Sequence, residues 1–205
     1  MSQMFLDPKT PLHTCRENSC KGCHVSDNIS CHFNVKQLLH FLSIAFPIFL
    51  LGGFKLYGYD WKFLILWIGI IIAYFGFVEI RTMCSHCPHY AEPTTKKLKC
   101  WANYSSPKLW KYNPGPMSKA EKIVFLAGMA TVFLYPVPFL IVLKDWFFLL
   151  LYLVLTTSFF YTLHMFLCSR CMNFACPFNN VPEETRHEFF KKNPTVAKAW
   201  GKDIT

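Results

Sequence analysis

Residues 61–80 read WKFLILWIGIIIAYFGFVEI, an apolar run whose only charged residues are Lys62 and Glu79, each close to one end. About 20 helical residues, at roughly 1.5 Å each, cross the ~30 Å hydrocarbon core of a bilayer. Comparable apolar runs occupy residues 35–54, 123–143 and 146–167. The sequence therefore predicts an all-α integral membrane protein with four transmembrane helices.

The composition and the distribution of charge support this class and predict an orientation. Of the 205 residues, 53% are hydrophobic and 18% aromatic, which is more than in an average soluble domain. The basic residues of the termini and the middle loop are Lys9, Arg16, Lys21, Lys36, Arg81, Lys96, Lys97, Lys99, Lys108, Lys111, Lys119, Lys122, Arg170, Arg186, Lys191, Lys192, Lys198 and Lys202. The two short opposite loops hold only Lys55, Lys62 and Lys144. By the positive-inside rule we expect a multi-pass protein of the cytoplasmic (inner) membrane with both termini in the cytoplasm.

All ten cysteines lie outside the apolar runs, in three clusters. The clusters are Cys15, Cys20, Cys23 and Cys31; Cys84, Cys87 and Cys100; and Cys168, Cys171 and Cys176. An even number of spans separates each cluster from the next, so all three are expected on one side. Because the cytoplasm keeps thiols reduced, this arrangement favours metal binding over disulfides.

These features divide the chain into five predicted segments. They are a cytoplasmic Cys-rich segment at 1–34, a transmembrane hairpin at 35–80, a cytoplasmic Cys-containing loop at 81–121, a second hairpin at 122–167, and a cytoplasmic Cys motif with an amphipathic tail helix at 168–205. The tail helix, expected from Pro182 to Trp200, would lie on the membrane, dock a partner or pack on the protein's own cysteine segments. Ser118 and Glu121 have the spacing of a helix capping box.

The two hairpins share a pattern that predicts a tandem repeat. An Asp-Trp pair opens the second helix of each hairpin, at Asp60 and at Asp145. A Cys-Ser-x-Cys motif follows 24 residues later at Cys84 and 23 residues later at Cys168. Parallel repeats of this kind are related by an axis along the membrane normal, which would bring the two motifs together.

The first cluster, Cys15-x4-Cys20-x2-Cys23-x7-Cys31, has enough ligands to close one site alone. Its first three cysteines have the spacing of a plant-type ferredoxin, although the fourth is much nearer here. Zinc suits the spacing nearly as well, and His24 and His32 would allow mixed ligation.

The second site is predicted to use Cys84, Cys87, Cys168 and Cys171, with Cys100 and Cys176 nearby. A proline follows both Cys87 and Cys176, as it follows a ligand cysteine in bacterial ferredoxins. We therefore favour two iron–sulfur clusters of the [4Fe–4S] type, with zinc as the alternative. Dithiol exchange is disfavoured, because it needs a helix N-terminus and these motifs follow helix C-termini.

Two histidines lie within the apolar runs, at similar depth near the predicted cytoplasmic face. His40 and His164 could bind a b-type haem or hydrogen-bond a quinone, and the alternative is a pair of interfacial histidines bonded to backbone or headgroups. Glu79 and Arg81, at the end of the second run, are expected to form an interfacial ion pair.

The cysteine–proline motifs after the second and fourth spans, at Cys84, Cys87, Pro88 and at Cys171, Cys176, Pro177, carry a resemblance. They resemble the four-helix iron–sulfur membrane subunits that take quinol electrons for nitrate and nitrous-oxide reductases. Segments such as 86–90 and 173–177 also look like those of uncharacterised Cys-rich membrane proteins of anaerobic prokaryotes. The spacing within the motifs differs from that of the quinol-oxidising family, and the tail lacks its ferredoxin repeats. The resemblance implies electron transfer from a quinol.

We therefore expect a membrane-anchored iron–sulfur electron-transfer subunit that links a cytoplasmic redox protein or larger complex to a membrane quinone or haem. Such a chain would serve a larger oxidoreductase instead of acting as an enzyme alone. Two alternatives stay open: a zinc-stapled membrane adaptor or assembly factor without redox activity, and a metal-delivery protein. The lipid bilayer is an expected partner and nucleic acid is not.

Overall fold

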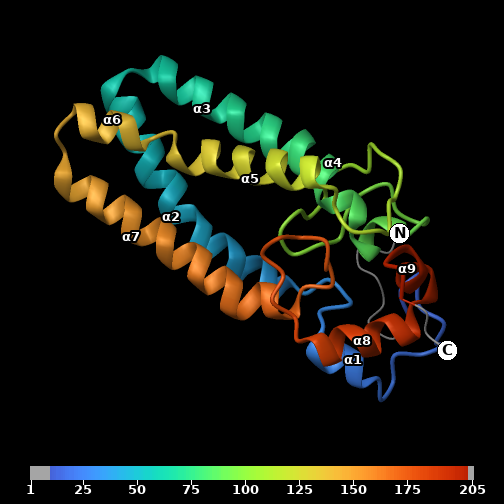
Figure 1. The fold of residues 1–205 in the computed structure, drawn as a ribbon. Coiled ribbons are helices and arrows are strands. Elements are labelled where there is room, and N and C mark those ends of the chain that lie inside the picture. The colour runs from blue at the N-terminus through green and yellow to red at the C-terminus, as the bar shows by residue number, and fades with distance from the viewer. Residues whose placement is uncertain (1–9, 203–205) are drawn as a thin grey trace, which may run out of the picture.

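The structure is a computed structural model that describes residues 10–202. Lys9 and the outer ends of the first and last predicted segments lie outside the described residues. Within the described range the chain is helical and contains no strand, apart from an isolated β-bridge between Lys97 and Pro107. Figure 1 shows an elongated bundle of helices with the remaining segments gathered at one end.

The first hairpin consists of α2 (Val35–Tyr59) and a second helix built from α3 (Trp61–Ala73), the π-helical segment η1 (Tyr74–Val78) and α4 (Glu79–Thr82). The side chain of Asn34 accepts a hydrogen bond from the Lys36 amide and caps α2. Asp60 caps α3 in the same way, by accepting from the Lys62 amide. These caps satisfy amides that have no partner inside the helix, so each helix begins at a defined residue.

The second hairpin is more interrupted than the first. It consists of α5 (Lys119–Leu134), α6 (Val137–Val142), α7 (Trp146–Thr162) and the π-helical segment η4 (Leu163–Leu167). Pro136 lies between α5 and α6, and Pro138 follows in the first turn of α6. Proline cannot donate the backbone hydrogen bond that would continue a helix, which explains the break. The capping box of Ser118 and Glu121 is confirmed at the start of α5.

All four predicted spans are confirmed as helices that are long and apolar enough to cross a membrane. They run Val35–Tyr59, Trp61–His86, Lys119–Val142 and Trp146–Arg170. Large apolar side chains on their outer faces are exposed, such as Phe46 at 63% and Phe147 at 70%. Exposed rings of this kind suit a lipid surface, so the chain is a multi-pass membrane protein.

Aromatic side chains and one glycine hold the bundle together. Phe133 packs against Phe49 from α2, with ring centroids 5.6 Å apart. The indole N–H of Trp67 donates to the Val132 carbonyl at 2.9 Å. Gly52 allows the helices to approach closely, because a Cβ there would come within 3.0 Å of the Trp67 ring. The bundle interior is therefore tightly packed at this level.

The segments 10–34, 83–118 and 168–202, which include the last turns of the second and fourth apolar helices, form one body at the end of the bundle, which we call the thiol cap (Figure 1). Its short helices are α1 (His24–Asn28), η2 (Cys84–His86), η3 (Pro88–Ala91), η5 (Cys168–Arg170), α8 (Glu183–Lys192) and α9 (Pro194–Ala199). The Ser30 amide donates to the Arg170 carbonyl at 2.8 Å. The indole N–H of Trp200 donates to the Pro114 carbonyl at 2.9 Å. These bonds join the first segment to the third and the third to the second.

The tail packs on the protein's own cysteine segments. Phe189 and Val196 are 0% and 2% exposed, within an apolar core that also contains Val25 from α1 and Met172. The tail forms two helices instead of one, because Asn193 separates α8 from α9. Of the three alternatives for the tail, the structure supports packing on the thiol cap.

Candidate metal centres

Each Cys-Ser-x-Cys motif folds as a single 3-10 turn directly after a membrane helix. The Cys87 amide donates to the Cys84 carbonyl at 3.0 Å, and the Cys171 amide donates to the Cys168 carbonyl at 3.3 Å. The intervening serine hydroxyl bonds back to its own helix in both motifs, Ser85 to the Arg81 carbonyl and Ser169 to Met165, at 2.7 Å each. Each turn therefore presents two cysteines at the end of the bundle.

Cys100 reaches the same region through a turn in the middle loop. The Leu98 amide donates to the Ser106 carbonyl at 2.8 Å, and the Ser105 amide donates back to Leu98 at 2.9 Å. Ser105 adopts a left-handed backbone conformation, with φ of 69°. Within this turn the side-chain amide of Asn103 donates to the Cys84 sulfur at 3.3 Å. The turn is thus fastened to the first cysteine motif.

Cys176 is held by a second irregular loop after η5. Its amide donates to the Asn173 carbonyl at 3.2 Å. The Asn173 side chain donates to the Met83 carbonyl at 3.0 Å, next to Cys84. The Asn180 amide donates to the Cys168 carbonyl at 3.2 Å. These bonds fold the loop back over both motifs.

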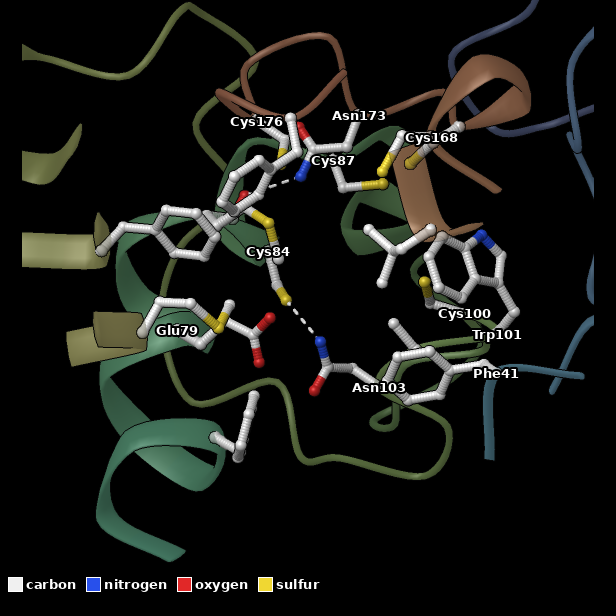
Figure 2. Close-up of a pocket in the computed structure, with 18 of the residues that line it drawn as sticks. Phe41, Glu79, Cys84, Cys87, Cys100, Trp101, Asn103, Cys168, Asn173 and Cys176 are labelled. Atoms are coloured by element: carbon white, nitrogen blue, oxygen red, sulfur yellow. Dashed lines mark hydrogen bonds between the residues drawn. The ribbon is translucent and has the colours of Figure 1, made fainter. Parts of the chain in front are cut away.

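The six cysteines of the second and third clusters line one cavity of about 100 Å³. They are Cys84, Cys87, Cys100, Cys168, Cys171 and Cys176. In Figure 2, Cys84 lies on one side of the open space with Glu79, Cys100 lies on the opposite side, and Cys87 and Cys168 lie at another edge. The predicted grouping of two Cys-x-x-Cys motifs with two further cysteines is therefore brought together around a single space.

Burial keeps these thiols protonated when no cation is bound. Burial and then the neighbouring Cys100 and Cys171 raise the pKa of Cys87 well above its usual value. Burial likewise raises the pKa of Cys176 to about 12, against a lowering effect of the Phe178 backbone. A reactive dithiol needs a lowered pKa, so the electrostatics disfavour thiol exchange. A bound cation would reverse this balance, because metal binding displaces thiol protons.

The first four cysteines line a separate, smaller cavity of about 20 Å³ beside α8, and all four are partly buried. The Lys192 ammonium at the end of α8 donates to the Cys23 sulfur at 3.5 Å and lies 3.4 Å from the Glu17 carboxylate. The Arg16 amide donates to the Lys192 carbonyl at 2.8 Å. The tail therefore closes one wall of this site.

The thiols of the small cavity influence one another. Burial and then the charges of Cys23, Cys20 and Cys15 raise the pKa of Cys31 to about 12. His32 lies with its Nε2 4.0 Å from the Cys20 sulfur and 2.8 Å from the Thr10 carbonyl. Of the two predicted mixed ligands, His32 thus lies beside the site, while His24 is exposed.

Thiolate sulfur is a ligand that zinc and iron–sulfur clusters both use, so the donor set of each cavity suits such a group. Within residues 10–202, no group of three or more His, Cys, Asp or Glu side chains stands in an arrangement that could hold a metal ion. The cysteines of each group line one cavity, but their sulfur atoms are not arranged around a single metal position.

The interior polar residues differ from expectation. His40 and His164 are both exposed, and neither lines the six-thiol cavity. The predicted ion pair of Glu79 and Arg81 is wrong, since Arg81 lies 3.4 Å from Glu121 instead. Residues two apart on a helix point in nearly opposite directions, which explains the error.

Two residues that the sequence analysis did not assign to the site line the six-thiol cavity, Glu79 and His89. Glu79 is 5% exposed and its Oε2 has no hydrogen-bond partner. His89 is 6% exposed, its Nδ1 also lacks a partner, and burial lowers its pKa to about 4. The position of His89 directly after Cys87-Pro88 was the signal in the sequence that could have revealed it.

Fold and site together define a four-span, Cys-rich helical membrane protein with two thiol-lined cavities in one cap. Comparisons with known protein families, with curated proteins and with solved structures found no match. The function must therefore be inferred from the site itself.

Proposed function

We propose that the protein is a membrane-anchored iron–sulfur subunit that passes electrons between a cytoplasmic redox partner and a molecule in the membrane. The observation that carries the proposal is the gathering of six cysteines from two distant segments around one cavity that continues into the bundle. An iron–sulfur cluster accepts and donates single electrons when it is bound to cysteine thiolates.

The size and the ligand number of the six-thiol cavity favour a cluster over a single zinc ion. A structural zinc site is closed and uses four ligands around one ion. Here six thiols surround about 100 Å³. One water needs only about 10–15 Å³, so this volume suits a group of several atoms. Cys84, Cys87, Cys168 and Cys171 are the proposed ligands, with Cys100 and Cys176 available beside them.

The protein side chains around this cavity would orient and insulate the bound group. The Asn103 amide donates to the Cys84 sulfur, and hydrogen bonds to sulfur raise or lower the potential of such sites. Trp101 packs edge-on against Phe41, with ring centroids 5.5 Å apart, and closes one side against water. These residues set the environment in which electrons would move.

The smaller cavity supports a second candidate, a structural zinc ion. Its volume of about 20 Å³ is close to that of one water molecule, and four cysteines line it. In that case the first cluster would staple the N-terminal segment to α8, and only the six-thiol cavity would carry electrons. A cluster in both cavities is the form that the cysteine spacing favours.

The proposal includes an internal repeat of the two hairpins, a cytoplasmic thiol cap and a cytoplasmic redox partner. Both hairpins contain a five-residue π-helical segment before the 3-10 turn with the Cys-Ser-x-Cys motif, which supports an internal duplication. The turn follows this segment directly in the second hairpin, whereas α4 lies between them in the first. The thiol cap would face the cytoplasm, as the basic residues indicate, and would meet its redox partner there. The weak resemblance to quinol-oxidising subunits is consistent with this reading.

The test is anaerobic purification of the full chain followed by iron, zinc and acid-labile sulfide analysis of one sample. We expect iron with matching sulfide. Cys171→Ser should lose the iron of the larger cavity, whereas the matched control Ser169→Ala, in the same turn, should keep it. Zinc without sulfide in both cavities would overturn the electron-transfer proposal. Zinc at one site with iron–sulfur at the other would assign the smaller cavity as a staple.

A further inference from the structure

The six-thiol cavity has a second, apolar end that its cysteines do not occupy. Phenylalanine rings from both hairpins line it, namely Phe41 and Phe49 from α2, Phe75 from η1, Phe125 and Phe133 from α5, and Phe159 from α7. At a rise of about 1.5 Å per residue, Phe49 and Phe133 lie roughly 20 Å along their helices from the cap. The cavity therefore runs from the thiols toward the middle of the membrane.

Glu79 lies between the two ends. It precedes Cys84 by five residues, and Figure 2 shows its carboxylate directed toward the open centre of the cavity. The side chain of Asn103 hydrogen-bonds Glu79, and the remaining carboxylate oxygen has no partner among the described residues. A buried acceptor without a donor is unfavourable, so this oxygen is suited to a hydroxyl group brought by a ligand.

The walls define the rest of that ligand. Phenylalanine rings favour a flat aromatic ring, which they contact edge-on or in offset stacks. In metal-free protein the whole cavity, its thiol end included, measures about 100 Å³, which is of the same order as the ~150 Å³ apolar cavity that holds benzene. Because the walls belong to the membrane spans, a lipophilic molecule is the natural occupant.

We propose that this end of the cavity binds the ring of a membrane-soluble hydroquinone, with a ring hydroxyl donating to Glu79. The inference rests on the proposed function in that it names the membrane partner of the thiol-bound group. Binding itself needs no cluster, so it can be measured on metal-free protein. It also moves the ligand site from His40 and His164, which are exposed, to Glu79.

The experiment titrates detergent-solubilised full-length protein with 2-heptyl-4-hydroxyquinoline N-oxide, a hydroxylated ring with an alkyl chain, and measures bound and free compound by equilibrium dialysis. Glu79→Leu removes the acceptor and should weaken binding by up to about ten-fold, as expected for one buried hydrogen bond. His40→Leu and His164→Leu should bind like the unaltered protein. The reverse pattern, with loss in the histidine variants only, would overturn the proposal.

A second pair of variants tests the cavity independently of Glu79. Ala45 is 6% exposed and lines the cavity, so Ala45→Phe should fill it and abolish binding. Ala130 lies on the exposed surface of α5, and Ala130→Phe is the matched control that should bind normally. Size-exclusion profiles and thermal midpoints would separate a filled cavity from an unfolded protein. Normal binding by a folded Ala45→Phe variant would overturn the proposal.

Metal analysis on the same preparations keeps the two proposals apart. Ring binding in protein that carries only zinc would support this inference and refute electron transfer. Iron and sulfide in protein that binds no ring would refute this inference and leave the electron-transfer proposal standing.

Discussion

The packing of Phe189 makes a quantitative prediction about the tail. Its side chain is 0% exposed and meets the Phe174 ring edge-on, with centroids 5.1 Å apart. Phe→Ala substitutions at such sites cost about 3–5 kcal/mol. At about 1.4 kcal/mol per factor of ten, Phe189→Ala should make opening of the tail at least a hundred-fold more frequent.

Hydrogen exchange measured by mass spectrometry would detect this opening. The Arg16 amide is a suitable reporter, because it donates to the Lys192 carbonyl and loses that partner when the tail leaves. We expect faster exchange in peptides covering Arg16 and residues 183–199, and unchanged exchange in α3. Glu188→Ala, on the exposed side of α8, is the control and should exchange normally.

Two results would refute this reasoning. Unchanged exchange at Arg16 in the Phe189→Ala variant would mean that the tail is not held by its apolar core. An equal increase in α3 would mean that the whole protein has loosened, so that the tail has no separate docking energy.

Two further predictions concern the bundle. A Cβ at Gly128 would overlap the Tyr74 ring, so Gly128→Ala should lower the free energy of unfolding by about 1–3 kcal/mol in detergent. A Cβ at Gly69 meets no atom within 4 Å, so Gly69→Ala should leave that free energy unchanged or raise it by up to ~1 kcal/mol. Equal unfolding midpoints for the two variants would contradict this prediction. The Lys55 ammonium lies 2.6 Å from the partly exposed Asp145 carboxylate. Asp145→Asn should therefore lower the free energy of unfolding by about 1–2 kcal/mol, and adding Lys55→Met should recover part of this loss. Additive losses in the double variant would argue against a direct ion pair.

The membrane helices could be predicted from the sequence because hydropathy, proline and capping residues each act locally. The apolar run at 61–80 and the capping box at Ser118 depend only on neighbouring residues, and both are present in the structure. The break at Pro136 could also be expected, because proline removes a helical hydrogen bond.

Side-chain direction was harder to predict, because it depends on helix rotation. His40 precedes Phe41 by one residue and is therefore turned about 100° away from it. Phe41 lines the cavity while His40 is exposed. The same argument separates Glu79, which faces inward, from Arg81, which pairs with Glu121. Hydropathy alone identified each helix, but it did not show which side of the helix faces the cavity.

Loop geometry was the least predictable part. Cys100 joins the cavity only because the turn around Ser105 folds back on Leu98, and a left-handed serine gives no clear signal in sequence. The joining of the two Cys-Ser-x-Cys motifs, by contrast, followed from the matched spacing after Asp60 and Asp145.

Cys87 connects the two candidate centres. Its side chain lines the six-thiol cavity, and it also belongs to the apolar core formed by Val25 and Phe189, against which Cys15, Cys23 and Cys31 pack. One packed body therefore supports both groups of thiols. If both cavities hold redox groups, Cys87 is the residue through which they are structurally coupled. Loosening the Phe189 core should then change how much metal is bound in both cavities. If the two metal sites were independent, only the smaller cavity would lose metal.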